Sequence, residues 1–546
     1  MLLVLGQPDS GCTTALRTLA NQRSGYTRVD GNVTYGGIDH ATFAKYFRGE
    51  AVYNQEDDVH HPTLKVGQIL SFALDTKTPG RRVTGMSVSD FKEDVITTLL
   101  KMFNMEHTRN TMAGGVAGIR GVSGGERKRI SIAEMMITRS SVACWDNTTR
   151  GLDASTALDF AKCLRILTDV YQLPNIVSLY QASENIYNLF DKVMVIHHGK
   201  QIYFGPTSKA RAYFEGLGYE PKPRQTTPDY LTGCTDEFER DIAQGQDPEK
   251  VPQTEEAMAA AYKASSIQQD VLAEINAYKE ELAANSEVRE HFVAAVAEQK
   301  RKHTPRKSVY SIPFYRQVFA LQKRLFQLKL QDWFTLATAL TTQIVCAVLV
   351  GTLFMNLPLT SDGAFTRGTL LINPDCLQLG GVIFISLLFS SLQAFSEMGS
   401  TMMGRPIVNK HQAFAFHRPA ALWVAQIFVD LPFAMTNIMC YSLIAYFSTG
   451  LYRTAGAFFT FYLYIVVGYV VMTLFFRSVG VVCPDFDYAM KFAAVIITFF
   501  VLSSGYLLPY NFIPWWIRWT FWIKYTPFPI LSQSLMVVLW LMDFRR

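Results

Sequence analysis

Residues 122–156 decide the fold and read VSGGERKRISIAEMMITRSSVACWDNTTRGLDAST. Ser123 can cap the helix that follows, and Glu126, three residues later, can complete a capping box. Gly124 and Gly125 at the start of this helix allow backbone N–H groups and the positive helix end to approach an anion closely. The stretch therefore predicts a capped helix whose amino end can face an anionic ligand.

An apolar strand that ends in a carboxylate follows the predicted helix. We expect the helix to end near Thr138, and residues 141–145 (SVACW) have the pattern of a buried strand that leads to Asp146. Asp146 stands where a P-loop nucleotide-binding fold places the acid linked to Mg²⁺. A capped helix and a buried strand alone would be a purely structural explanation. That explanation does not account for SGGE, a strand ending in an acid and the turn before Asp153 in this order.

A second phosphate-binding pattern stands at the start of the chain. Residues 6–14 (GQPDSGCTT) have the glycine spacing of a P-loop between a strand and a helix. Its candidate nucleotide-binding residues are Gly6, Ser10, Gly11, Cys12, Thr13 and Thr14. Thr13 can offer a hydroxyl to Mg²⁺ alongside Asp146. Cys12 replaces the expected lysine, and losing a charged donor to phosphate costs about 1.5–3 kcal/mol if nothing compensates.

These motifs resemble the signature, Walker B and D-loop of ATP-binding cassette (ABC) transporters. VSGGERKR together with CWDN resembles the first half of the pleiotropic drug resistance family, full-length fungal exporters of the G subfamily. The resemblance covers essentially the whole chain and implies ATP and Mg²⁺ as cofactors. It implies an α/β P-loop nucleotide-binding domain of ABC type, lacking its first strands, followed by an all-α polytopic membrane domain of the ABC-2 or G type.

Three positions depart from the catalytic pattern of that family. Asn147 stands where a glutamate should polarise the attacking water, and a general base commonly contributes about 10²–10⁴ in rate. Tyr180, in IVSLYQAS, replaces the switch histidine. Glu56 falls at the Q-loop glutamine when the loop is aligned on Pro62, whereas Gln55 lies one position early. A polar loop before a helix remains a fair alternative for that segment.

The signature and the D-loop match the family. In the family each composite site pairs the Walker residues of one half with the signature of the other half. The resemblance therefore implies a Walker site that hydrolyses ATP poorly and a signature that serves a partner cassette in trans. The partner is a second ABC half, in the same full-length polypeptide or in another chain. The residues assigned to this part are Ser123, Gly124, Gly125, Glu126 and Asp153.

Composition divides the chain into a soluble part and a membrane part. Of its 546 residues 49% are hydrophobic, and the charged residues concentrate before about position 330. The net charge of +5 gives no reason to invoke nucleic acid as a partner. We predict a nucleotide-binding domain at 1–235, a solvated helical linker at 236–313, an amphipathic connecting helix at 314–332, and a transmembrane domain at 333–546.

About five apolar stretches can span a bilayer, since roughly 20 helical residues cover about 30 Å of hydrocarbon. The predicted spans are 334–355, 377–395, 422–447, 456–476 and 492–508, with an outer re-entrant segment near Trp515. Lysine and arginine before the first span and between the second and third place these segments inside. Asp430 lies within a span, where an acid is a functional candidate. It precedes Pro432, however, so a packing role is an equal alternative.

Three features separate the chain from the family pattern. It starts at the P-loop strand, residues 369–380 read like an insertion, and it stops before a sixth span. A fragment or a faulty gene model is therefore one expectation. The leading functional prediction is ATP-dependent efflux of hydrophobic or amphipathic small molecules by an integral plasma-membrane protein whose nucleotide-binding domain is cytoplasmic. The alternative is a non-transporting fragment or a regulatory cassette protein.

Overall fold

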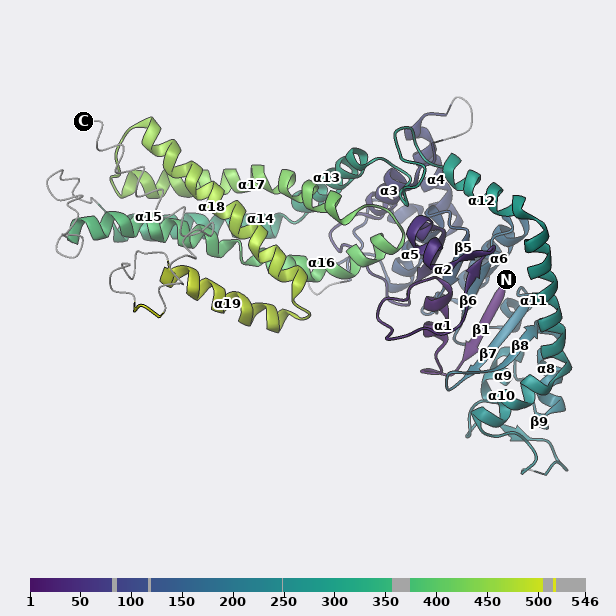
Figure 1. Cartoon of the computed structure of the whole chain (residues 1–546). Helices are drawn as coiled ribbons and strands as arrows, with labels where there is room; N and C mark the ends of the chain where they lie inside the picture. Colours follow the sequence, from purple (N-terminus) through teal and green to yellow (C-terminus); the bar gives the residue numbers. More distant parts are fainter. Residues whose placement is uncertain (81–85, 116–118, 248, 356–373, 504–513, 517–546) are drawn as a thin grey trace. The chain divides into compact units, whose positions relative to one another are not determined.

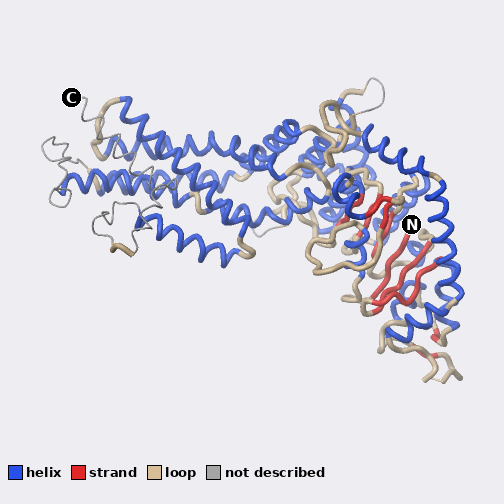
Figure 2. The backbone as a smooth tube through the Cα atoms, in the orientation of Figure 1, coloured by secondary structure: helices blue, strands red, loops and turns tan. Residues whose placement is uncertain are grey.

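The computed structural model describes residues 1–80, 86–115, 119–247, 249–355, 374–503 and 514–516. The chain divides into two compact units, each described here by itself (Figures 1 and 2). The nucleotide unit comprises Met1–Arg324 with Ile407–Leu422, and the membrane unit comprises Leu325–Pro406 with Trp423–Arg546. The segment 407–422 thus belongs to the same unit as the sheet, although it falls inside the predicted transmembrane domain.

A six-stranded sheet organises the nucleotide unit, with strand order β4-β5-β6-β1-β7-β8 (Figure 2). Its strands are β1 (Leu2–Gly6), β4 (Ala51–Asn54), β5 (Val142–Trp145), β6 (Asn175–Ser178), β7 (Lys192–His197) and β8 (Lys200–Pro206). The first five in that order run parallel, and β8 pairs antiparallel with β7. Parallel strands end at one edge of a sheet, which is where such folds bind ligands. The loops after β1, β4, β5 and β6 therefore meet at that edge.

Helices pack around this sheet because their apolar residues recur on one side. Leu16 of α1 is fully buried against Val4 of β1 and Cys144 of β5. The main helices of the unit are α1 (Cys12–Leu19), α2 (His40–Tyr46), α3 (Val66–Lys77), α4 (Val88–Met102), α5 (Gly124–Ile137), α6 (Ala154–Tyr171), α7 (Glu184–Tyr187), α8 (Thr207–Gly216) and α9 (Thr227–Gly233). The minor strands are β2 (Thr34–Tyr35), β3 (Ile38–Asp39), β9 (Tyr219–Glu220) and β10 (Asp241–Ile242). The helix predicted after Ser123 and the strand predicted before Asp146 are confirmed.

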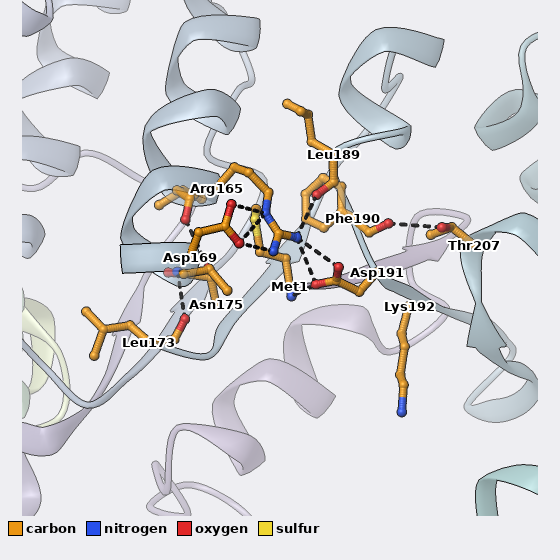
Figure 3. A network of polar contacts seen from close by, with 12 residues as sticks. Met1, Arg165, Asp169, Leu173, Asn175, Leu189, Phe190, Asp191, Lys192 and Thr207 are labelled. Carbon is orange, nitrogen blue, oxygen red and sulfur yellow. Dashed lines mark hydrogen bonds and ion pairs between the residues drawn. The ribbon is translucent and has the colours of Figure 1, made fainter. Parts of the chain in front are cut away.

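Polar contacts tie α6 to the start of β7 (Figure 3). Arg165 on α6 donates through Nη1 to both carboxylate oxygens of Asp191, each at 2.9 Å. Its Nε donates to Asp169, one helical turn further on, at 2.9 and 3.0 Å. Such partly exposed pairs contribute only about 0–1 kcal/mol each. They orient α6, whose amino end carries the D-loop aspartate, more than they stabilise it.

The predicted linker is helical but is not solvated throughout. It forms α10 (Glu255–Ala264), α11 (Ser266–Ala284) and α12 (Ser286–Glu298). Met258 and Tyr262 of α10 are buried, and the Tyr262 hydroxyl donates to the carbonyl oxygen of Phe204 in β8 at 2.6 Å. Composition suggested a solvated segment because alanine and charged residues dominate it, while two large side chains of α10 are enough to dock that helix.

The membrane unit consists of helices. Helix α13 (Phe314–Gln331) corresponds to the predicted connecting helix and continues into this unit. The others are α14 (Trp333–Leu353), α15 (Pro374–Gln393), α16 (Ser396–Ala413), α17 (Pro419–Ser448), α18 (Ala455–Val482) and α19 (Phe486–Ser503). Among the described residues four segments are long and apolar enough to cross a membrane, namely Trp333–Leu353, Gly381–Ala413, Pro419–Ser448 and Ala455–Val482. The predicted fifth span and the segment near Trp515 extend beyond the described residues.

Four charged side chains meet inside the membrane unit and account for Asp430. Lys329 Nζ lies 2.8 Å from Asp430 Oδ1, and Arg477 Nη2 lies 2.6 Å from Glu397 Oε2. Arg477 also contacts Asp430, and its side chain is only 4% exposed. Charges taken out of water need such partners. Asp430 is therefore one member of a neutral cluster of two cations and two anions rather than an isolated acid.

Candidate nucleotide-binding site

The P-loop has the backbone shape that phosphate binding requires. Gly11, the residue before α1, has φ +99°, a left-handed conformation that glycine adopts without strain. A Cβ at Gly6 would lie 2.7 Å from the carbonyl oxygen of Ile196, so only glycine fits there. The Ser10 hydroxyl is buried and has no hydrogen-bond partner. The loop thus leaves one buried polar group ready for a ligand beside the amino end of α1.

Cys12 supplies no charge to this loop. Burial, with the negative charge of Asp146 as a second cause, raises the pKa of the Cys12 thiol to about 11. The group is therefore a neutral thiol at physiological pH, neither a cation nor a thiolate. Thr13 and Thr14 follow it on the first turn of α1 and are exposed. The charge missing from the lysine position is not replaced by the residue that stands there.

Asp146 is held by two hydroxyl groups that the sequence motifs did not reveal. Tyr53 at β4 donates to Asp146 Oδ2 at 2.6 Å, and Ser178 at the end of β6 donates to Oδ1 at 2.7 Å. Asp146 itself is only 3% exposed. Ser178 is the last residue of β6 and Tyr53 the last but one of β4; these strands flank β5, so the parallel sheet brings both hydroxyls to the acid. A hydroxyl residue near the end of each neighbouring strand was the available signal.

The side chain at the catalytic-base position contacts the Q-loop. Asn147 Nδ2 donates to Glu56 Oε1 at 3.1 Å, and Arg150 donates to the same oxygen. The backbone of Asn147 has φ +45°, where asparagine is among the better tolerated residues. The contact with Glu56 raises the pKa of Arg150. The structure thus brings the predicted positions 56 and 147 together beside Arg150, a residue the sequence did not single out.

Tyr180 itself is 56% exposed and follows β6. Among the residues that the structure describes, no hydrogen bond engages its hydroxyl, in contrast to Tyr53. Its side chain carries no imidazole, the group on which the switch role of a histidine depends.

The signature forms the predicted capping box at the amino end of α5. Ser123 Oγ accepts the backbone N–H of Glu126 at 3.3 Å, and Glu126 Oε2 accepts the backbone N–H of Ser123 at 2.8 Å. The backbone N–H and the hydroxyl of Ser123 both donate to this carboxylate and lower the pKa of Glu126. A Cβ at Gly124 would meet no atom within 4 Å, so this face is open, whereas one at Gly125 would lie 3.3 Å from the carbonyl oxygen of Gly151.

The D-loop aspartate caps the next helix. Asp153 Oδ2 accepts the backbone N–H of Thr156 at 3.0 Å, and Oδ1 accepts its hydroxyl at 2.6 Å. Thr156 thereby lowers the pKa of Asp153. Because Gly125 lies against Gly151, the signature and the D-loop turn of this chain are neighbours.

These residues fit a nucleotide with its cation, although the positive charge of the expected lysine is missing at Cys12. The unpartnered Ser10 hydroxyl, the amino end of α1 and the exposed hydroxyl of Thr13 suit phosphate and Mg²⁺. Asp146 offers a carboxylate for the same cation. Among the described residues no group of three histidine, cysteine or acidic side chains could hold a metal ion on its own. A cation here would therefore share its ligands with the nucleotide.

Comparison with known families accounts for both units. Residues 1–150 match the ABC transporter family, and residues 316–530 match the ABC-2 type transporter family. The chain therefore belongs to the ABC transporters, and its apolar helices make it an integral membrane protein.

Individual relatives extend along nearly the whole chain. ABC multidrug transporter I of Aspergillus fumigatus is 57% identical over 98% of this chain and 35% of its own length. ABC transporter G family member 14 of Dictyostelium discoideum is 41% identical over 95% of this chain and 35% of its own length. Fungal multidrug and G-family transporters are thus its relatives, and the chain spans about a third of their length. A bacterial ABC transporter cassette of known structure aligns with 38% of this chain and 85% of its own length, at 16% identity and a TM-score of 0.30.

Proposed function

We propose that this chain is the degenerate-site half of an ATP-driven exporter. Its Walker residues bind Mg·ATP weakly and hydrolyse it poorly, and its signature completes a second site whose Walker residues belong to a partner cassette. The observation that carries the proposal is the contrast between Asn147, whose amide donates to Glu56 and cannot accept a proton from water, and the capped, open signature at Ser123–Glu126.

Each group has a role in this proposal that follows from its chemistry. The P-loop backbone and the amino end of α1 hold phosphate, Thr13 and Asp146 hold Mg²⁺, and Tyr53 and Ser178 orient Asp146. The lysine charge is missing at Cys12, so affinity falls, and a base is missing at position 147, so turnover falls. The signature needs none of these groups, because it offers an exposed serine hydroxyl and a helix amino end to a phosphate held elsewhere.

A transport assay on the chain joined to its second half tests the division of labour. Ser123→Arg places a bulky cation on the open signature face and is expected to abolish transport-coupled ATP hydrolysis. Asn147→Ala removes an amide that does not serve as a base and should leave at least half of the activity. Equal losses from the two substitutions would reject the proposal. So would a turnover near 10 s⁻¹, about the enzyme median, for the purified chain without a partner.

We propose hydrophobic or amphipathic small molecules as the cargo, moved outward across the plasma membrane. Support comes from the apolar spans, which offer roughly 25 cal/mol per Å² of buried apolar surface and few fixed polar partners. Several relatives are named multidrug transporters. Cells that express the full-length protein should retain less of a lipophilic fluorescent dye than empty-vector cells. Unchanged dye retention together with export of a polar solute would contradict this assignment.

The second candidate is a non-transporting fragment or a regulatory cassette protein. The chain spans about a third of the length of the curated relatives it matches. The reading frame of the transcript on both sides separates the two: a second cassette in frame supports the exporter, and stop codons at both ends support the fragment.

A further inference from the structure

Arg150 has no place in the proposed nucleotide chemistry, yet it stands at the centre of the Walker end. It belongs to the turn between Asp146 and the D-loop, and it donates to Glu56 Oε1, the oxygen that also accepts Asn147 Nδ2 at 3.1 Å. Its side chain is 70% exposed, whereas that of Glu56 is 35% exposed. A pair as exposed as this adds little stability. Its effect must lie in where it holds the Glu56 carboxylate.

The Q-loop is held at Glu56 from a second direction. Lys128 on the signature helix α5 donates to the backbone carbonyl oxygen of Glu56, and its side chain is 3% exposed. The Lys128 Nζ also lies 3.8 Å from Asp58 Oδ1, two residues further along the loop. These contacts fix both the backbone and the side chain of Glu56, and they hold its carboxylate beside Asn147.

That position matters because of what a base needs. A general base must lie about 2.6–3.2 Å from the water whose proton it takes. The Glu56 carboxylate already lies 3.1 Å from the Asn147 amide nitrogen, which is within this range. The other amide atom of the side chain, Asn147 Oδ1, is buried without a partner. The amide nitrogen of Asn147, its donor atom, is thus bonded to Glu56.

We propose that Arg150 is a positioning residue that holds the Glu56 carboxylate against Asn147, so that positions 56, 147 and 150 form one coupled unit that closes the base position. This inference rests on the proposed poor hydrolysis by this Walker site and gives it a cause beyond missing groups. It implies that glutamate cannot simply be restored at position 147. Two carboxylates about 3 Å apart repel each other.

A carboxylate introduced at position 147 tests this arrangement. In Asn147→Glu the new carboxylate lies against that of Glu56, and two like charges at this distance repel each other. The Gln side chain of Asn147→Gln has the same size as Glu and the same backbone requirement but no charge, so Asn147→Gln is the matched control.

The experiment measures thermal unfolding of the purified full chain at pH 7. At pH 7 we expect Asn147→Glu to melt roughly 2–6 °C below Asn147→Gln. Adding Glu56→Gln should remove this difference in melting temperature, and adding Arg150→Gln should reduce it, because Glu56 is then no longer held against position 147. Arg139→Gln, at an exposed arginine of the same unit, is the control for arginine loss.

Each other outcome decides against the proposal. Equal melting temperatures of Asn147→Glu and Asn147→Gln would contradict the coupling between positions 56 and 147. Equal effects of Arg150→Gln and Arg139→Gln would remove the positioning role of Arg150. If Asn147→Glu does not fold, recovery of folded protein by Glu56→Gln supports the coupling and its absence overturns it. Fast ATP turnover by the unaltered chain in the same preparation would instead reject the proposed function and leave the coupling intact.

Discussion

The signature end and the Walker end of the nucleotide unit differ in what their polar groups contact. At the signature end, Ser123 and Glu126 satisfy each other and leave the glycine at position 124 open. At the Walker end, two hydroxyl groups donate to Asp146, and the Asn147 amide donates to Glu56. The polar groups of the signature end therefore bond within the capping box and leave Gly124 exposed. At the Walker end the polar side chains instead bond to one another. Three substitutions test this contrast.

The largest expected effect is at Asp146. Asp146→Ala leaves the buried hydroxyls of Tyr53 and Ser178 without their acceptor, and each buried unsatisfied group costs about 1–3 kcal/mol. We expect a loss of about 2–6 kcal/mol in the free energy of unfolding, measured by denaturant titration. At Asp153, an exposed cap, the same substitution should cost about 1 kcal/mol. Equal losses at the two aspartates would contradict the contrast between the two ends.

The next effect is a gain of affinity at Cys12. Cys12→Lys restores a charged donor in the P-loop, and hydrogen bonds to charged groups contribute about 1.5–3 kcal/mol. Binding of Mg·ATP, measured with a fluorescent nucleotide, should tighten roughly 10–100-fold. Cys12→Ala should change it less than about twofold, because the thiol is neutral. If lysine binds no better than alanine, the missing charge is not what weakens this site.

The smallest effect is at the signature cap. Ser123→Ala removes the cap of α5 and should lower the free energy of unfolding by about 1 kcal/mol at pH 7. The pKa of Glu126 is lowered in the folded chain, so its contribution is present above the unfolded value near 4.3 and is lost as pH falls through the folded value. The difference between wild type and Ser123→Ala should therefore shrink in acid. A difference that grows below pH 4 would contradict the capping box.

The helix boundaries at the signature could be predicted because their causes are local. A serine, two glycines and a glutamate within four residues set the cap of α5, and an apolar run ending in an acid sets β5. The linker was less predictable: Tyr262 docks α10 on β8 through a carbonyl 58 residues earlier in the chain, which no local pattern indicates. The predicted domain boundary also missed 407–422, which joins the nucleotide unit through contacts between distant segments.

The amino-acid sequence by itself determined the family, the order of the motifs and which chemical groups are absent at positions 12, 147 and 180, since these depend on residue type and spacing. Only the tertiary structure decided what replaced them. Tyr53 and Ser178 reach Asp146 because three parallel strands end at one edge, and Arg150 reaches Glu56 across 94 positions of the chain. In the membrane unit Asp430 finds Lys329 and Arg477 on separate helices. Such pairings follow from how strands and helices are brought together in space, and the spacing of residues along a chain does not encode them.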